Sequence, residues 1–361
     1  MPKIYAQVKE YFTHPQVIHI IGTNGKGTTG RFLATALLRA GFRVGHYTSP
    51  HIVAFHERIW LNGAHISDAV LEQAHQKLLH ILSQEQAEHL SYFEYTTLLA
   101  MYIYRDVDYV VLEAGLGGEH DATAVFDNIF TLVTPIGKDH ESFLGNSIEA
   151  IVKTKLNAVR KTAILSQQSH PIVRDLSMSI VRQKGCNFFN AEQLLDEKDK
   201  EKIAAIAQNL SLEHYLVNNL SLAVSALKFL KIPYTVESFH NARLFGRMSK
   251  LGSNVILDVG HNTLAAKAIK NALKDRMFTL VYNSYKDKNY EEILHILKPV
   301  IQNVQIIAIE DERIVQEALL EEALSNLAIQ YSHFTAFDAN KDYLVFGSFS
   351  VVAAFLKVYN A

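Results

Sequence analysis

Three closely spaced glycines surround one lysine near the start of the chain, in the stretch Gly22-Thr-Asn-Gly25-Lys26-Gly27-Thr28. Glycines at such spacing let successive backbone N–H groups converge on one point, and a following helix adds the positive end of its dipole. The lysine adds a positive charge, and a nearby threonine hydroxyl can face a metal ion. The stretch therefore predicts a loop that binds nucleotide phosphates.

An ordinary strand-to-helix turn is the alternative, because turns also use glycine for its dihedral freedom. An apolar run from Val17 to Ile21 precedes the loop, and a helical pattern follows over Arg31–Ala40. The lysine therefore lies between a buried strand and a helix, which favours the phosphate-binding interpretation.

Polar side chains also follow other predicted strands. Glu113 ends the clearest buried strand pattern, where a carboxylate is costly unless it is paired or holds a metal ion. Ser49 follows the strand predicted over 43–47, and His140 follows the one over 129–135. Because ligands gather at the carboxyl ends of parallel strands, we expect Glu113 to coordinate Mg²⁺ beside the phosphate loop. For Ser49 alone, a turn before a proline is an equally good interpretation.

The segments that carry these residues alternate between strand and helix patterns. This alternation predicts an α/β protein with parallel sheets and right-handed crossovers. The 361 residues suit two domains. We expect a P-loop nucleotide-binding domain with a mainly parallel sheet over 1–242, and a smaller doubly wound, Rossmann-like domain over 243–361. A composition shift between 240 and 254 places the boundary.

Three further segments carry local predictions. A helix is predicted over 148–160 and carries Lys155. The segment 191–209, charged in its first half, is expected to be a variable surface segment. A buried helix is expected to begin at Asn219, which would then cap it.

Composition excludes several classes of protein. A net charge of -2 argues against nucleic acid or a membrane surface as the main partner. The single Cys186 excludes an internal disulfide and a cysteine metal cluster. No stretch approaches the roughly 18 apolar residues of a membrane span, and the first residues do not resemble a secretion signal. We expect a cytoplasmic monomer.

The phosphate loop resembles the ATP loop of the Mur ligase superfamily, in the form found in folylpolyglutamate synthases and dihydrofolate synthases. Blocks similar to that family's motifs recur along nearly the whole chain: Thr48-Ser-Pro-His, Gly115-Leu-Gly-Gly-x-x-Asp-Ala-Thr123, Asp139-His-x-x-x-Leu-Gly and Asp258-Val-Gly-His-Asn. The resemblance implies an ATP-dependent ligase that joins L-glutamate to the carboxylate of dihydropteroate or of folyl(poly)glutamates through an acyl phosphate. The alternatives are a cell-wall precursor ligase of the Mur type and a non-ligase ATP-binding switch module.

The resemblance also implies roles for single residues. It assigns ATP contacts to Asn24, Gly25, Lys26, Gly27, Thr28, Asn219, Arg247, Asp258 and His261. It assigns metal ligands to Ser49, Glu113, His140 and Lys155, for one Mg²⁺ ion or two, and it leaves room for a monovalent cation. It assigns catalysis to Lys26, His140 and Lys155. It assigns contacts with dihydropteroate or folate to Phe93, Glu94, His120, Asp121 and Ala122.

Lys155 presents a chemical problem, because a bare ammonium beside Mg²⁺ would be repelled. Relatives in the superfamily carry a carbamate at this lysine, which supplies an anionic oxygen ligand. The alternative is a surface lysine on the outer face of its helix. Phe93 and Glu94 have a core alternative too, since aromatic residues at a helix start are commonly buried.

Overall fold

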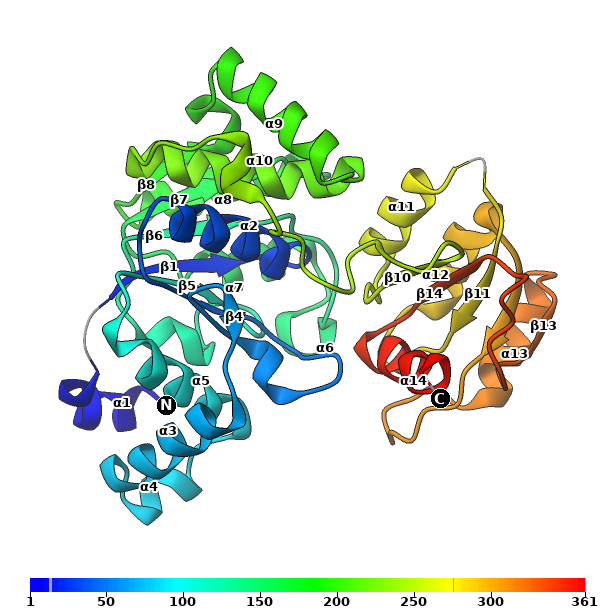
Figure 1. The fold of residues 1–361 in the computed structure, drawn as a ribbon, viewed down its shortest axis with the longest axis horizontal. Coiled ribbons are helices and arrows are strands. Elements are labelled where there is room, and N and C mark those ends of the chain that lie inside the picture. Colours follow the sequence, from blue (N-terminus) through cyan, green and yellow to red (C-terminus); the bar gives the residue numbers. More distant parts are fainter. Residues whose placement is uncertain (13–14, 275, 361) are drawn as a thin grey trace. The chain divides into compact units, whose positions relative to one another are not determined.

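The computed structural model describes residues 1–12, 15–274 and 276–360, which form two compact units (Figure 1). The first unit comprises Met1–Gly137 and Glu141–Arg243. The second comprises Leu244–Ala361 together with the short segment Lys138–His140. Among the described residues, no helix combines the length and apolarity needed to cross a membrane.

An eight-stranded sheet forms the centre of the first unit. Its strands, in spatial order, are β4 (Ala64–His65), β3 (Ile59–Leu61), β2 (Val44–Tyr47), β5 (Tyr109–Glu113), β1 (Gln16–Ile21), β6 (Phe130–Val133), β7 (Thr162–Leu165) and β8 (Asn187–Asn190). Strands β2, β5, β1, β6, β7 and β8 pair in parallel in this spatial order, and β3 and β4 add an antiparallel edge next to β2. The mainly parallel sheet predicted from the sequence is confirmed.

Helices cover both faces of this sheet. They are α1 (Pro2–Val8), α2 (Lys26–Arg39), α3 (Asp68–Ile81), α4 (Gln84–Glu88), α5 (Tyr92–Ile103), α6 (Glu141–Leu144), α7 (Ile148–Leu156), α8 (Pro171–Gln183), α9 (Glu197–Asn209) and α10 (His214–Leu230). Figure 1 shows α2 and α10 on one face and α3 and α5 on the other. Successive side chains of β1 explain this layering: Ile18 and Ile20 pack in the α2 and α10 core, whereas Val17 packs in the α3 and α5 core.

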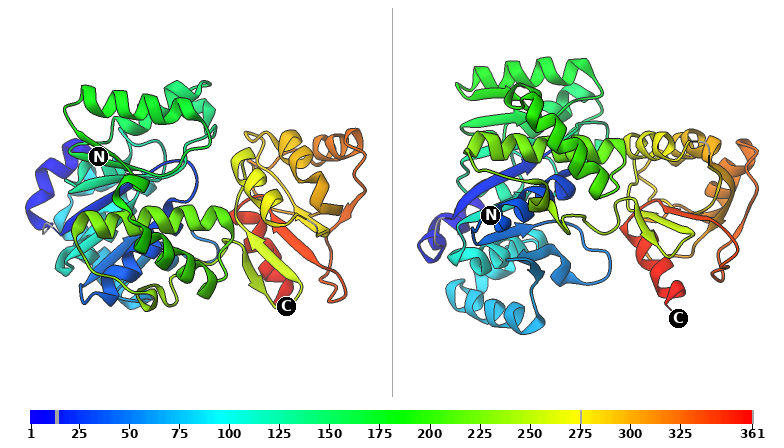
Figure 2. Two further views of the ribbon diagram at one scale, coloured as in Figure 1. Left: turned by 90° about the horizontal axis from the view of Figure 1, so that it is seen from above. Right: turned by 45° about the horizontal axis from the view of Figure 1, so that its top comes forward.

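The second unit contains a six-stranded sheet. Its strands, in spatial order, are β13 (Tyr331–His333), β12 (Ile301–Ile306), β11 (Phe278–Tyr282), β14 (Tyr343–Phe346), β10 (Val255–Asp258) and β9 (Ser249–Leu251). All pair in parallel except β9, which runs antiparallel to β10. Its helices are α11 (Thr263–Ala272), α12 (Tyr290–Leu297), α13 (Glu317–Asn326) and α14 (Phe349–Tyr359). Figure 2 shows α14 and α11 on opposite sides of the sheet, as expected for a doubly wound domain.

Helix α2 begins earlier than the sequence pattern predicts. It starts at Lys26 rather than Arg31, because Gly25 adopts a left-handed conformation (φ 86°) and ends the loop abruptly. The helix start was predicted too late because glycine has a low helix propensity, and Gly27 and Gly30 lie in the first two turns of α2. The helix predicted over 148–160 instead ends at Leu156.

The segment 191–209 was expected to be a variable surface segment. Helix α9 occupies Glu197–Asn209 within it and buries Ile203 and Ile206. A further expectation is wrong. Asn219 does not begin a helix, since α10 starts at His214 and places Asn219 in its second turn. The capping alternative for Asn219 is therefore excluded.

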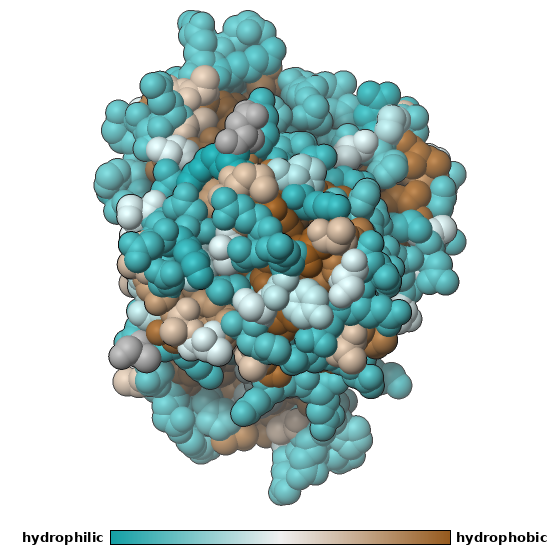
Figure 3. Space-filling model, turned by 90° about the vertical axis from the view of Figure 1, so that its right-hand side faces the viewer, coloured by the Kyte–Doolittle hydropathy of each residue, from teal (hydrophilic) through white to brown (hydrophobic). Residues whose placement is uncertain are grey.

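The face of the molecule seen in Figure 3 is mostly hydrophilic, and its apolar residues form small patches.

Candidate active site

The predicted phosphate loop lies directly between β1 and α2. Strand β1 ends at Ile21, and α2 begins at Lys26, so Asn24 and Gly25 lie in the loop while Gly27 and Thr28 lie in the first helical turn. The first N–H groups of a helix have no intrahelical partner and attract anions. The hydroxyl of Thr28 is buried and has no hydrogen-bond partner among the described residues. A bound phosphate or metal ion would satisfy such a group.

Asn219 of α10 lies against this loop. A Cβ placed on Gly25 would come within 2.3 Å of the Asn219 Oδ1 atom. Only glycine fits here, because φ is positive and the asparagine amide fills the space a side chain would need. The structure thus places a predicted nucleotide contact beside the phosphate loop from a helix almost 200 residues away in sequence.

Two lysine ammonium groups approach the carbonyl of Gly22. Nζ of Lys155 donates a hydrogen bond to it at 2.8 Å, and Nζ of Lys26 lies 3.4 Å from it. Lys155 is 4% exposed. The surface alternative for Lys155 is therefore wrong. Two cations beside one loop favour a strongly anionic ligand such as a polyphosphate.

Glu113 ends β5 beside the loop. Its Oε1 atom lies 3.9 Å from Nζ of Lys26, and its Oε2 atom accepts a short hydrogen bond from the hydroxyl of Thr48. Ser49, the next residue after Thr48, is half-buried. A buried carboxylate with hydroxyl groups nearby is the oxygen donor set that Mg²⁺ prefers.

Asp121 follows the loop after β5, and its carboxylate accepts three hydrogen bonds. The donors are the backbone N–H of Leu116 at 2.8 Å, the backbone N–H of Thr123 at 2.9 Å and the Thr123 hydroxyl at 2.5 Å. Burial raises the pKa of the Asp121 carboxyl, and these hydrogen bonds partly oppose that shift. Gly118 allows α7 to approach this loop, because a Cβ there would lie 2.7 Å from the Lys155 carbonyl oxygen.

The other predicted substrate contacts differ in environment. The ring of Phe93 stacks on that of Tyr47 with centroids 6.0 Å apart. Ala122 is buried, and His120 is exposed. The carboxylate of Glu94 caps its own helix by accepting the N–H of Ser91, and it also pairs with the chain's amino terminus. For Glu94 the geometry favours a structural role.

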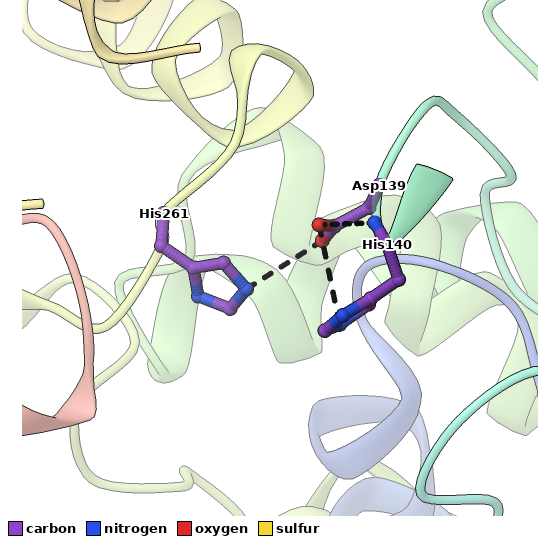
Figure 4. A group of neighbouring side chains, drawn as sticks. All are labelled: Asp139, His140 and His261. Carbon is purple, nitrogen blue, oxygen red and sulfur yellow. Dashed lines mark hydrogen bonds and ion pairs between the residues drawn. The ribbon is translucent and has the colours of Figure 1, made fainter. Parts of the chain in front are cut away.

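In the second unit, Asp139 forms the centre of a charged cluster (Figure 4). Its carboxylate pairs with Lys288 at 2.7 Å, accepts a hydrogen bond from the Asn262 amide at 2.9 Å, and lies 3.5 Å from His261 and 3.9 Å from His140. Burial alone would raise the pKa of Asp139, but the hydrogen bond to His261 and the nearby charges hold it well below its usual range. His140 and His261, predicted to bind metal and nucleotide, therefore both lie beside one carboxylate.

The donor atoms of Asp139, His140 and His261 lie within 4.8 Å of one another, as a metal site requires. However, Lys288 already neutralises much of the carboxylate charge. This cluster was not predicted from the sequence, although Asp139, His140 and His261 each belong to a motif similar to the family's. Nothing in the sequence spacing indicates that Asp139 pairs with Lys288 across 149 residues.

Arg247 and Asp258 belong to the same unit. The Arg247 guanidinium lies 5.2 Å from the centre of the Phe349 ring. Asp258 ends β10 and accepts hydrogen bonds from the N–H groups of Met248 and Gly260, at 3.0 and 2.8 Å. Asp258 therefore stabilises the turn that carries Arg247.

Comparisons with known proteins point in one direction, although no protein-family model matches the chain. The dihydrofolate synthase/folylpolyglutamate synthase of Escherichia coli is 30% identical, over 96% of this chain and 87% of the relative. The dihydrofolate synthase/folylpolyglutamate synthase of Haemophilus influenzae is 29% identical, over 95% of this chain and 89% of the relative. The structure of Helicobacter pylori folylpolyglutamate synthetase matches with a TM-score of 0.79 at 36% identity, over 100% of this chain and 94% of that one. The structure of Escherichia coli FolC with DHPP and ADP matches with a TM-score of 0.82 at 26% identity, over 99% and 92%.

Proposed function

Because this chain belongs to the dihydrofolate synthase/folylpolyglutamate synthase family, it catalyses the ATP-dependent ligation of glutamate in folate metabolism, and we propose that its ATP site is built on the loop between β1 and α2. Family membership excludes the two alternatives, a cell-wall precursor ligase and a non-ligase ATP-binding module.

The observation that supports this site best is the approach of two ammonium groups to the loop. Lys26 and Lys155 both lie within hydrogen-bond reach of the Gly22 carbonyl, so they concentrate positive charge where polyphosphate would bind. Asn219 would contact the nucleotide from α10. During phosphoryl transfer, negative charge spreads over the phosphate oxygens, and fixed cations stabilise that charge.

Mg²⁺ would supply further neutralisation of the phosphate oxygens when bound. The residues of the first unit fit such an ion, since Glu113 is a buried carboxylate and the Thr28 hydroxyl has no partner among the described residues. We propose Glu113 and Ser49 as its ligands, with Lys155 as a further ligand if it is carbamylated. His140 is the proposed ligand for a second ion.

The pterin substrate would lie at Asp121. The Escherichia coli FolC structure has DHPP and ADP bound, and we propose that this chain binds dihydropteroate or folate through Asp121, Phe93 and Ala122. We propose that residues 243–361 bind L-glutamate, and that Arg247, Asp258 and His261 contact the nucleotide. A cytoplasmic location and a monomeric state remain predictions.

In the proposed reaction, a carboxylate oxygen of the pterin substrate forms a bond to the γ-phosphorus as the bond to ADP breaks. The amine of glutamate then attacks the acyl carbon, and phosphate leaves. The products are an amide, ADP and phosphate.

Steady ADP release tests this function, with dihydropteroate and tetrahydrofolate offered separately as carboxylate substrates. We expect release to require both glutamate and one of these acids. Steady ADP release without glutamate would contradict the proposal.

A further inference from the structure

Behind Asp121 lie two buried polar side chains, joined to it by hydrogen bonds, that the proposed reaction does not use. His19, in the middle of β1, and Thr123, in the 3-10 helix Ala122–Val125, are each 1% exposed. The Nε2 atom of His19 lies 2.8 Å from the Thr123 hydroxyl oxygen, and that hydroxyl lies 2.5 Å from Oδ1 of Asp121. These two hydrogen bonds thus connect β1, in the middle of the sheet, to Asp121.

Proton counting gives each hydrogen bond a direction. The Thr123 hydroxyl donates its single proton to Oδ1 of Asp121. The Thr123 oxygen must then accept the Nε2–H of His19. Burial, and next the charge of Arg160, lower the pKa of His19 to about 4, so the ring is neutral at pH 7 and carries its one proton on Nε2.

This arrangement leaves Nδ1 of His19 buried with no partner among the described residues. An unsatisfied buried nitrogen costs about 1–3 kcal/mol, so an apolar side chain would suit the strand better if packing were the only requirement. Capping of the 3-10 helix explains why Asp121 accepts the N–H of Thr123. Capping does not explain the histidine, which reaches Thr123 from another element.

The contacts limit what Asp121 can still do. A carboxylate offers about four acceptor positions, and the Leu116 N–H, the Thr123 N–H and the Thr123 hydroxyl occupy three of them. The carboxylate is therefore held in one orientation, with about one position left for a ligand N–H.

We propose that His19 and Thr123 are positioning residues that hold the Asp121 carboxylate in the orientation that accepts a hydrogen bond from the pterin ring. This inference rests on the proposed function, in which Asp121 contacts the pterin. It adds two residues that act on substrate affinity without touching the substrate.

Calorimetric binding of dihydropteroate without ATP, together with KM values, tests the proposal. Thr123→Val keeps the side-chain volume but removes the hydroxyl, so we expect Kd and KM for dihydropteroate to rise about tenfold, as for the loss of one hydrogen bond to a charged group. KM for ATP should stay within about twofold, since the hydrogen bonds of the Thr123 side chain among the described residues go to His19 and Asp121, not to the phosphate loop. Thr123→Ser restores the hydroxyl and should restore affinity, and His19→Phe should weaken binding in the same direction as Thr123→Val.

A double variant shows whether Thr123 acts through Asp121. Asp121→Asn with Thr123→Val should bind dihydropteroate no more weakly than Asp121→Asn alone, whereas additive losses would overturn the proposal. Thr131→Val is the matched control, because Thr131 is buried opposite His19 in the sheet register and its hydroxyl hydrogen-bonds only to Asn128 among the described residues. An equal loss of affinity in this control would assign the effect to packing and overturn the proposal.

Ligation activity and the positioning role of Thr123 are tested by different outcomes. If the wild-type protein shows no glutamate-dependent ligation, the proposed function fails. If ligation proceeds normally but Thr123→Val binds dihydropteroate as tightly as the wild type, only the positioning role fails.

Discussion

Replacement of Gly25 by alanine should separate backbone strain from steric conflict in the ATP loop. Gly25 has a φ of 86°, and a Cβ there would lie 2.3 Å from Oδ1 and 2.9 Å from Cγ of Asn219. The left-handed backbone costs a residue with a Cβ about 1–2 kcal/mol. Overpacking against Asn219 adds about 1–3 kcal/mol. The sum of about 2–5 kcal/mol should lower Tm by roughly 5–15 °C in a unit of this size.

Gly41 provides the matched control for this experiment. It has a φ of 96°, and a Cβ there would meet nothing within 4 Å. Gly41→Ala should therefore show only the backbone part of the loss. Adding Asn219→Ala to Gly25→Ala should recover the steric part, about 1–3 kcal/mol.

Thermal unfolding followed by calorimetry, with and without ATP, measures these differences. Gly25→Ala should also weaken the stabilisation by ATP, because the loop must shift to relieve the contact with Asn219. Equal losses of Tm in Gly25→Ala and Gly41→Ala, with no recovery in the double variant, would refute the reasoning.

Four further predictions follow from individual side chains. Lys26→Ala should lower kcat/KM for ligation about a hundredfold or more, as for loss of one group that stabilises transition-state charge, with Tm nearly unchanged; retained activity would reject the ATP site. Glu113→Gln should move the Mg²⁺ titration of activity to higher concentrations, because an amide is a poorer ligand for a hard cation, and an unchanged curve would count against Glu113 as a ligand. Lys155→Ala should abolish activity, and short carboxylates should partly restore it if a carbamate is present; near-normal activity without additive would remove Lys155 from the site. His19 has a folded-state pKa of about 4 against 6.5 unfolded, so the free energy of unfolding should fall as pH drops through this range, by up to about 1.4 kcal/mol per pH unit. Acid titration of stability in His19→Phe should show a smaller slope, and an identical slope would contradict the assignment.

Local chemistry made much of this fold predictable. The buried run before the phosphate loop became β1, and Ser67 and Ser147 cap α3 and α7 as expected for serines before amphipathic helices. Each of these features depends on residues close in sequence. Glu113 at the end of an apolar strand was likewise identifiable, because a carboxylate there needs a partner.

Features that depend on distant residues were not predictable. The sequence contains no signal that Lys288 pairs with Asp139, or that His19 reaches Thr123, because these contacts form only when the sheets assemble. The segment Lys138–His140 belongs to the second unit although both flanking segments belong to the first, and a boundary drawn at one point in the sequence cannot represent that. Asn219 was misplaced for a related reason, since its helix continues through polar residues that weaken the apolar pattern.

The most direct test of the central claim, that ATP activates the carboxylate of the pterin substrate, uses dihydropteroate whose carboxylate oxygens carry a heavy isotope. During ligation by the wild-type enzyme, one labelled oxygen should pass to the phosphate released, because that oxygen bonds to phosphorus before glutamate displaces it. Mass spectrometry of the phosphate measures the transfer. Transfer of one label for each amide formed is the result predicted here, and unlabelled phosphate would contradict carboxylate activation by ATP.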